Sequence, residues 1–123
     1  MNRNIINCNN VSDLRLLAKK KLPKPVFDYI DGAADDEVTY LRNTEAFKSC
    51  DLIPNVLHNI ENIDMSVNVL GSKLDMPIFC SPTALQRIFH ADGEKAVAKA
   101  ANKYGTMFGV SSLGTISLSD ISK

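Results

Sequence analysis

The side chain that is best suited to bind a ligand is that of Tyr29. It lies in the apolar stretch from Leu22 to Ile30, just before a Gly-Ala-Ala turn at 32–34. A phenol can donate a hydrogen bond to an anionic oxygen while its ring packs against apolar side chains. This combination suits the recognition of a carboxylate group. Considered alone, a tyrosine in such a stretch is more often a core residue whose hydroxyl reaches the surface.

Two further segments place small or polar residues directly after apolar runs. Pro82, Thr83 and Ala84 follow the run 77–81, and Ser111 follows the run 106–110. A proline beside a small residue lets the backbone approach a flat aromatic ligand, and hydroxyl groups can hydrogen-bond ring heteroatoms. Taken singly, each feature is more typical of an ordinary turn or helix cap.

Three helices are predicted before any strand. They run from Ser12 to near Leu22, from about Pro25 to Ile30 before Gly32, and from Asp35 or Asp36 to about Ser49. Ser12 suits the cap of the first helix, and the acidic pair suits the positive end of the third. Apolar spacing predicts that the third helix buries Val38, Leu41 and Phe47 on one side.

The second half of the chain predicts strands and helices in alternation, which is typical of an α/β fold. Residues 67–74 indicate a small hairpin with its turn at Gly71-Ser72. The apolar runs 77–81 and 106–110 predict parallel strands, the first of them buried on both faces. A helix is expected from Asp92 or Gly93 to just before Gly105, and another from Ser117 or Ser119.

Three segments taken in order carry a family resemblance. They read LPKPVFDYIDGAADDE (22–37), MPIFCSPTALQRIFHADGE (76–94) and TMFGVSSLGTIS (106–117). They resemble the FMN-dependent 2-hydroxy acid oxidases and dehydrogenases, a family that includes glycolate oxidase, flavin-linked L-lactate dehydrogenase and mandelate dehydrogenase. The match runs from about Val11 to Ile121 and covers only the N-terminal portion of the family.

The resemblance implies a TIM (β/α)8 barrel, which normally takes about 250 residues. A chain of 123 residues is therefore expected to hold only the N-terminal part of the barrel. We expect one incomplete domain, with a helical segment (1–50), a hairpin region (51–75) and a segment with the first two barrel strands, the first helix and the start of the second (76–123).

The resemblance also implies roles for individual residues. Tyr29 matches the tyrosine that binds the substrate carboxylate. Pro82, Thr83 and Ala84 match the segment that lines the isoalloxazine ring of FMN near N5, and Ser111 matches a serine that hydrogen-bonds the ring. The implied reaction oxidises an L-2-hydroxy acid to the 2-keto acid by hydride transfer to flavin N5.

The other parts of the family's active site are expected outside this chain. The catalytic histidine, the substrate arginine, a lysine near flavin N1 and the phosphate-binding loops belong to later strands, so no residue here is assigned as catalytic. His58, His90 and Arg87 are interpreted as surface or loop residues. Leu113 stands where glycolate oxidases tend to carry tryptophan, which favours a lactate-like substrate. The chain alone is expected to be inactive, and the sequence does not specify the electron acceptor.

Composition narrows the partners. With 14 basic and 14 acidic residues, the chain offers no electrostatic reason to bind nucleic acid or anionic lipid. No stretch reaches the roughly 18 apolar residues of a membrane span. Three scattered cysteines lack disulfide or zinc spacing, so we expect a reducing, cytoplasmic location and no metal. The resemblance implies that the full-length form is a homo-oligomer.

Two alternatives to the enzyme hypothesis remain. The chain can be a non-catalytic interaction module whose partial barrel pairs its open strand edges with another chain. It can also be one piece of a split flavoprotein. A flavin barrel that acts on nucleotides or isoprenoids is disfavoured by the segment around Tyr29.

Overall fold

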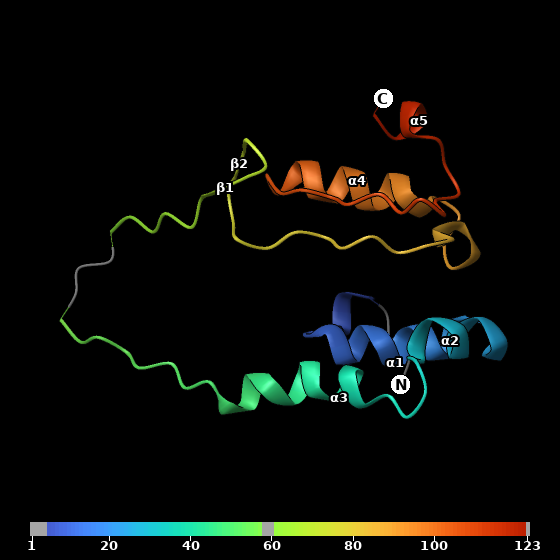
Figure 1. Ribbon diagram of the computed structural model, residues 1–123, viewed down its shortest axis with the longest axis horizontal. Coiled ribbons are helices and arrows are strands. Elements are labelled where there is room, and N and C mark those ends of the chain that lie inside the picture. The colour runs from blue at the N-terminus through green and yellow to red at the C-terminus, as the bar shows by residue number, and fades with distance from the viewer. Residues whose placement is uncertain (1–4, 58–60, 123) are drawn as a thin grey trace. The chain divides into compact units, whose positions relative to one another are not determined.

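The computed structural model describes residues 5–57 and 61–122. Contacts within the chain divide it into two units, Met1–His58 and Asn59–Lys123, and each is described by itself (Figure 1). The first unit contains the 3-10 helix η1 (Ile5–Asn7), helices α1 (Val11–Lys21), α2 (Lys24–Asp31) and α3 (Val38–Glu45), and the 3-10 helix η2 (Ala46–Ser49). The three α-helices confirm the predicted order of elements in this half.

Helix α1 is capped by Asn10 and not by Ser12, so that prediction is wrong. Asn10 has an extended backbone (φ −152°), and its side-chain oxygen accepts a hydrogen bond from the Asp13 amide at 2.9 Å. Ser12 therefore falls inside the first turn, where its hydroxyl is not needed as the cap. The predicted end near Leu22 is confirmed, since the Leu22 amide donates to Ala18 as the last helical bond.

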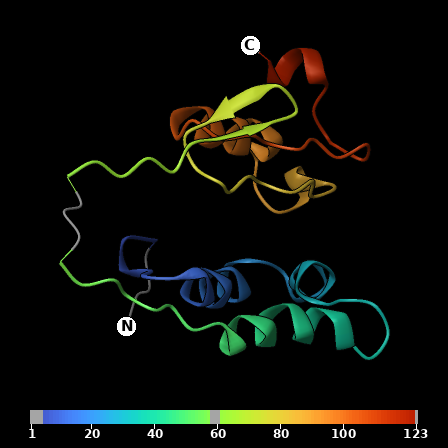
Figure 2. The same ribbon diagram turned by 60° about the vertical axis from the view of Figure 1, so that its left-hand side comes forward.

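Helix α2 packs against α1 and forms with it the small core of the first unit. Phe27 on α2 and Leu17 on α1 are the buried apolar residues described in this unit. Pro25 lies in the first turn, where its missing amide costs nothing. Gly32 follows the last helical residue and donates to Asp28 at 3.1 Å, which confirms the predicted stop. Figure 2 shows α1 and α2 side by side.

Helix α3 begins later than predicted. Glu37 adopts the left-handed conformation (φ +57°), so helical backbone starts only at Val38. The last part of the predicted helix is the 3-10 turn η2 and not α-helix.

The predicted burial along α3 is also wrong. Val38, Leu41 and Phe47 are all exposed. The core of the first unit consists of one residue from α1 and one from α2, which is too small to cover a third helix. The apolar spacing therefore predicted the helix α3 correctly but predicted the burial of its apolar side chains wrongly.

The second unit begins with the predicted hairpin. Strands β1 (Val67–Val69) and β2 (Ser72–Leu74) pair antiparallel, with Val67 opposite Leu74 and Val69 opposite Ser72. Leu70 and Gly71 form the turn, and both have positive φ, which is the pattern of a type I′ turn. The turn thus lies one residue earlier than predicted, and Ser72 belongs to the strand.

The two predicted barrel strands are present only as a single parallel bridge. Cys80 pairs with Phe108, the Cys80 amide donates to Met107 at 3.0 Å, and the Gly109 amide donates back to Cys80 at 2.9 Å. The prediction that the first strand is buried on both faces is wrong, since Ile78 is 68% exposed and Phe79 is 50% exposed. A parallel strand needs neighbours on both edges and covering layers on both faces, and the described residues supply one neighbour.

Helices complete the second unit. The 3-10 helix η3 (Gln86–Ile88), α4 (Gly93–Lys103) and α5 (Leu118–Ile121) follow the hairpin. The predicted bounds of the main helix are confirmed, because α4 begins at Gly93 and ends before Gly105, whose φ is +60°. Ser117 caps α5 as predicted by accepting from the Asp120 amide. Among the described residues, no helix has both the length and the apolar character to cross a membrane.

Candidate functional site

The ends of the two paired segments form the core of the candidate site. Pro82, Thr83 and Ala84 begin two residues beyond Cys80, and Ser111 lies three residues beyond Phe108. Because the pairing is parallel, both sets of residues leave the pair at the same end. In Figure 1 both segments run in the same direction, the first as the yellow trace below α4 and the second as the orange trace that crosses it in this view. The structure thus brings together four of the five predicted site residues.

Close packing fixes the distance between the two segments. Gly109 lies directly against Pro82, and a Cβ added to this glycine would come within 3.1 Å of two ring carbons of the proline. Beyond them, the Leu85 amide donates to the Leu113 carbonyl at 3.1 Å. The loops after the two strands are therefore joined by a main-chain hydrogen bond as well as by the bridge that precedes them.

Ser111 forms a compact turn at the end of the second segment. Its hydroxyl oxygen accepts from the Leu113 amide at 3.1 Å, and its carbonyl accepts from the Gly114 amide at 3.0 Å. A hydroxyl oxygen that accepts in this way keeps its own proton available for donation. Ser111 is half-buried, whereas Pro82 and Thr83 are exposed.

The chemistry of these groups fits the ring of a flavin. They offer hydroxyls, main-chain groups and small side chains, which can approach a planar heterocycle closely and hydrogen-bond its heteroatoms. The side-chain Nε2 of Gln86 donates to the Thr83 carbonyl at 3.3 Å, which holds the first loop in a closed turn. The fit concerns the ring, since these residues carry no positive charge for a phosphate.

A buried carboxylate stands behind the two loops. Glu94, at the start of α4, is 0% exposed, and its two oxygens accept from the amide and the hydroxyl of Thr115 at 2.8 and 2.7 Å. Burial alone would raise the pKa of Glu94. The hydrogen bonds from Thr115, together with those from the backbone of Glu94 and Gln86, outweigh burial and lower that pKa below its ordinary value.

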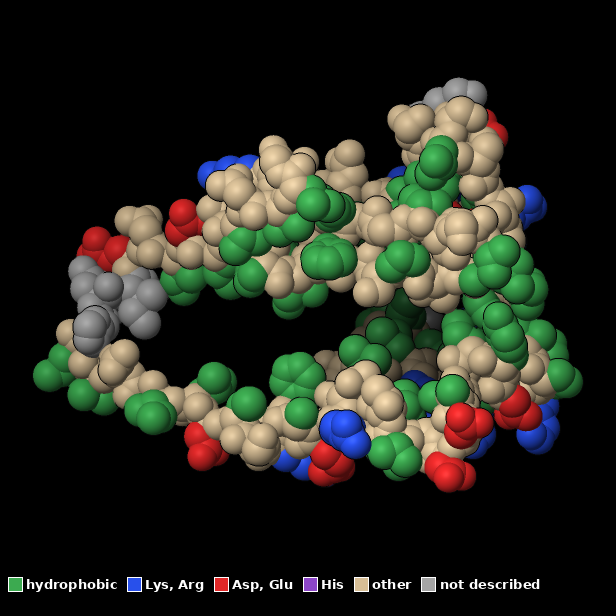
Figure 3. Space-filling view, in the orientation of Figure 1, with side chains coloured by type: hydrophobic (Ala, Val, Ile, Leu, Met, Phe, Trp, Pro, Cys, Tyr) green, Lys and Arg blue, Asp and Glu red, His purple; other side chains and the backbone are tan. Residues whose placement is uncertain are grey.

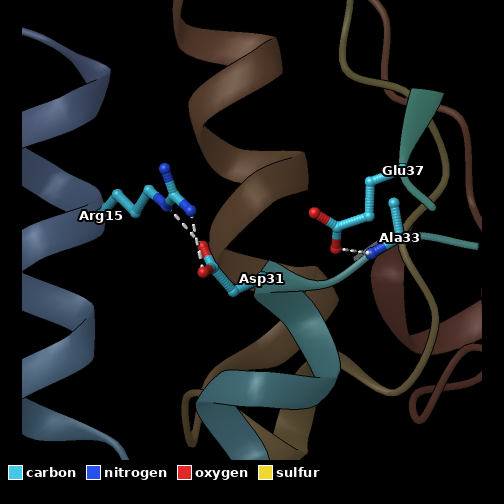
Figure 4. Close-up of polar contacts among 4 residues, drawn as sticks. All are labelled: Arg15, Asp31, Ala33 and Glu37. Carbon is cyan, nitrogen blue, oxygen red and sulfur yellow. Dashed lines mark hydrogen bonds and ion pairs between the residues drawn. The ribbon is translucent and has the colours of Figure 1, made fainter. Parts of the chain in front are cut away.

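The segment that carries Tyr29 belongs to the first unit and is held at its C-terminal end by two carboxylates (Figure 4). Arg15 on α1 makes a bidentate pair with Asp31, with Nε to Oδ1 at 2.5 Å and the second nitrogen to Oδ2 at 2.9 Å. Glu37 accepts from the Ala33 amide at 3.0 Å and closes the turn after α2.

This ion pair shifts the pKa of both groups in the direction that favours their charged forms. The hydrogen bond from Arg15 lowers the pKa of Asp31, against a smaller opposite effect of desolvation. The same hydrogen bond raises the pKa of the Arg15 guanidinium. Tyr29 lies two residues before Asp31, so the pair orients the helical turn that carries the phenol.

Tyr29 itself is 63% exposed, which argues against a core role within its unit. Tyr29 belongs to the first unit, whereas Pro82 and Ser111 belong to the second, and each unit is described by itself. The prediction that its phenol meets the two strand ends therefore stays a prediction.

The histidines and the arginine of the loops add little to the site. His90 is exposed, and its Nδ1 accepts from the Asp92 amide at 3.2 Å. Arg87 is exposed and packs its side chain against Gly93. His58 lies outside the described residues.

Sequence reasoning missed Glu94 and Thr115. The only available signal was an acidic residue in the first turn of a helix that follows a predicted strand, and such residues are usually exposed. It also missed the partnership of Arg15 with Asp31, since these residues lie on two different helices.

Comparison with known proteins places these features in one family. The FMN-dependent dehydrogenase family matches residues 18–123. Glycolate oxidase 1 of Oryza sativa subsp. indica is 43% identical over 112 residues, and glycolate oxidase of Spinacia oleracea is 41% identical over the same length; each alignment covers 91% of this chain. The chain spans 30% of the length of these curated relatives.

Solved structures agree with the sequence match. A soluble mutant of the membrane-associated (S)-mandelate dehydrogenase from Pseudomonas putida superposes with a TM-score of 0.85 at 35% identity, over 92% of this chain and 32% of that one. A mandelate oxidase in complex with (S)-4-hydroxymandelic acid gives the same TM-score at 30% identity, over 91% and 32%. The chain therefore belongs to the FMN-dependent dehydrogenase family and corresponds to less than one third of these relatives.

Proposed function

We propose that this chain forms one wall of the flavin site, and the carboxylate-binding helix, of an enzyme that oxidises an L-2-hydroxy acid to the 2-keto acid. The observation that carries the proposal is the parallel pairing of Cys80 with Phe108, which brings the two predicted flavin-contacting segments together. Family membership supports FMN as the cofactor.

Each residue has a defined part in this proposal. Pro82 and Ala84 pack against the ring of the bound flavin, while the hydroxyls of Thr83 and Ser111 hydrogen-bond its heteroatoms. Tyr29 donates its phenolic proton to the substrate carboxylate and so orients the α-carbon. FMN, when bound, supplies the acceptor for the hydride that leaves that carbon.

The complete reaction needs groups that we do not assign to this chain. A base must take the hydroxyl proton of the substrate as the hydride departs, and a guanidinium is expected to share the carboxylate with Tyr29. His90 is exposed and occupied by Asp92, so it is a poor candidate for the base. We therefore propose that residues 1–123 alone do not turn over substrate. We also propose a cytoplasmic, homo-oligomeric full-length form.

The substrate is proposed to be larger than glycolate. Leu113 belongs to the same turn as Ser111, to which its amide donates, and its side chain is exposed. A leucine leaves more room beyond the α-carbon than the tryptophan that glycolate oxidases tend to carry. A methyl or larger substituent on the substrate can use this room, which favours L-lactate.

A chimera tests the function directly. Residues 1–123 replace the matching 30% of rice glycolate oxidase 1, and oxidation of L-lactate and glycolate is measured with FMN bound. We expect activity with a preference for L-lactate. Tyr29→Phe should lower kcat/KM about 10- to 100-fold, the usual cost of losing a hydrogen bond to a charged group.

Two further chimeras separate binding from specificity. Leu113→Trp should shift the preference toward glycolate and leave the flavin spectrum unchanged. Tyr40→Phe, a tyrosine from the same unit without an assigned role, serves as the matched control and should keep activity. A chimera that binds FMN normally but shows the same kcat/KM with Tyr29 and with phenylalanine would refute the role of Tyr29.

A second candidate function rests on the exposed apolar surface. Large apolar side chains are exposed in both units, and Figure 3 shows hydrophobic side chains spread over the surface of each. In the second unit, the exposed Ile78 and Phe79 belong to the same segment as Cys80, whose bridge to Phe108 is the one strand pairing that the described residues give it. Such a surface suits a separate polypeptide that carries further strands, as in an interaction module or a split flavoprotein. Co-expression with residues beyond the matched part of the rice enzyme should then yield a stable complex that co-purifies.

A further inference from the structure

Glu94 is the largest fully buried side chain described in this chain, and it is ionisable. A buried carboxylate is costly unless hydrogen-bond donors surround it. Here both oxygens are used by one residue, Thr115, through its amide and its hydroxyl. The backbone amides of Gln86 and of Glu94 itself donate as well.

These donors come from three different segments. Gln86 belongs to the loop after the first paired segment, Glu94 to the first turn of α4, and Thr115 to the loop after the second paired segment. The Arg87 amide also donates to the Thr115 hydroxyl at 3.3 Å, which ties the first loop to the second. The carboxylate of Glu94 thus links both loops to α4, the helix that connects them.

The link continues from Thr115 to the proposed flavin wall through Gly114. A Cβ on Gly114 would lie 3.6 Å from the Glu94 carboxylate and 3.1 Å from the Ser111 carbonyl, so the chain here is packed between the two. On the other loop, the Leu85 amide meets the Leu113 carbonyl. Displacement of Thr115 should therefore also displace Ser111 and the loop that begins with Thr83.

We propose that Glu94 is a positioning residue that fixes the two loops of the flavin wall relative to each other. It does not touch the cofactor and acts only through Thr115 and Gln86. This inference rests on the proposed function, because the importance of the two loops comes from the flavin that they are proposed to line. The fixed relation between the loops is itself measurable without any flavin.

The experiment uses the 123-residue chain and two measurements by NMR. The first is amide hydrogen exchange at Leu85, Leu113 and Thr115. Glu94→Gln replaces one acceptor oxygen by a donor, so we expect exchange at these amides to become about tenfold faster, as for one lost buried hydrogen bond. Thr115→Val removes the hydroxyl and should have a similar effect, whereas Thr115→Ser keeps it and should restore protection.

The second measurement is the shift of the Ser111 and Thr83 amides on addition of FMN. We expect shifts in the wild-type chain and in Thr115→Ser, and their loss in Thr115→Val, while amides in the middle of α4 keep their positions. Glu61→Gln makes the same chemical change at an exposed position of the same unit and serves as the matched control.

The outcomes distinguish the two proposals. If FMN moves no amide in the wild-type chain, the proposed flavin wall is wrong, and the exchange data still decide whether Glu94 joins the loops. If Glu94→Gln prevents folding, the Thr115→Val and Thr115→Ser pair decides the question. Unchanged exchange at Leu85 and Leu113 in Thr115→Val overturns the positioning role.

Discussion

Replacement of Gly109 by alanine tests the geometry of the two paired segments. The glycine lies against Pro82, and a new methyl group would stand 3.1 Å from both Cγ and Cδ of the ring. Ordinary carbon contacts begin near 3.4 Å, so one segment must withdraw by about 0.3 Å. The change occurs where the two proposed flavin-contacting loops leave the pair, and it should widen the gap between them.

The size of the effect follows from two opposing contributions. Overpacking of this kind costs about 2 kcal/mol, and Pro82 is exposed, so the ring has some freedom to move. Loss of glycine also stiffens the unfolded chain and stabilises the folded state by about 0.4–1 kcal/mol. The clash therefore prevails by about 1 kcal/mol. That difference should make local opening of the pair about fivefold more frequent.

Amide exchange at Cys80 reports this opening, because its amide donates across the pair to Met107 at 3.0 Å. Gly71→Ala is the control, since its methyl group meets no atom within 4 Å and any strain from its positive φ stays within the hairpin turn. We expect faster exchange at Cys80 in Gly109→Ala and no change in the control. Slower exchange in Gly109→Ala would show that Pro82 does not lie against this residue.

Three other predictions concern separate parts of the chain. Gly105→Ala forces a non-glycine residue to φ +60° and places its Cβ 1.9 Å from an oxygen of Asp75; the left-handed backbone costs about 1–2 kcal/mol, so the thermal midpoint by circular dichroism should fall by several degrees, and an unchanged midpoint would contradict the contact. Arg15→Met should raise the pKa of Asp31 toward its ordinary value in a carbon-13 NMR titration, since the guanidinium lowers it; an unaltered titration would mean that the ion pair does not form in solution. The folded-state pKa of Glu94 lies below the ordinary value of 4.5, so the stability that its ionisation contributes is complete above that value and is lost as the pH falls through the folded-state pKa. The urea concentration at the unfolding midpoint should therefore fall on acidification below about pH 4.5, and fall less in Glu94→Gln; equal acid sensitivity in the two proteins would refute this.

Local signals in the sequence were enough to predict most elements. Proline and glycine positions located α2, and alternating apolar residues with a glycine located the hairpin. The helix α4 was predicted at both ends because Gly93 and Gly105 mark its limits. These features depend on neighbouring residues only, which a single sequence contains.

Features that depend on distant residues were not predictable in the same way. The third helix starts only at Val38, after a left-handed Glu37 whose carboxylate accepts from the Ala33 amide, and apolar spacing reveals neither feature. The two barrel strands are reduced to one bridge because the described chain offers each of them one partner. Strand length is set by neighbours, while the strand pattern is set by the sequence.

In the candidate site, too, some features could be predicted from the sequence, whereas those that depend on distant residues could not. Pro82 to Ala84 and Ser111 were predicted from the resemblance, and their meeting at one end of the pair follows from parallel geometry. The burial of Glu94 did not follow, because a glutamate in a first helical turn has the same local sequence whether it faces water or a threonine hydroxyl. Only the path of the loop through Thr115 determines which it is.

The short span of the parallel pair has a consequence for synthesis on the ribosome. The Thr106 hydroxyl donates to the Ile78 carbonyl, a contact between positions 28 apart. Closing so short a loop costs little chain entropy, and α4 can form within it as soon as it is made. Both segments proposed to face the cofactor can thus come together within one short stretch of newly made chain, between residues 78 and 106.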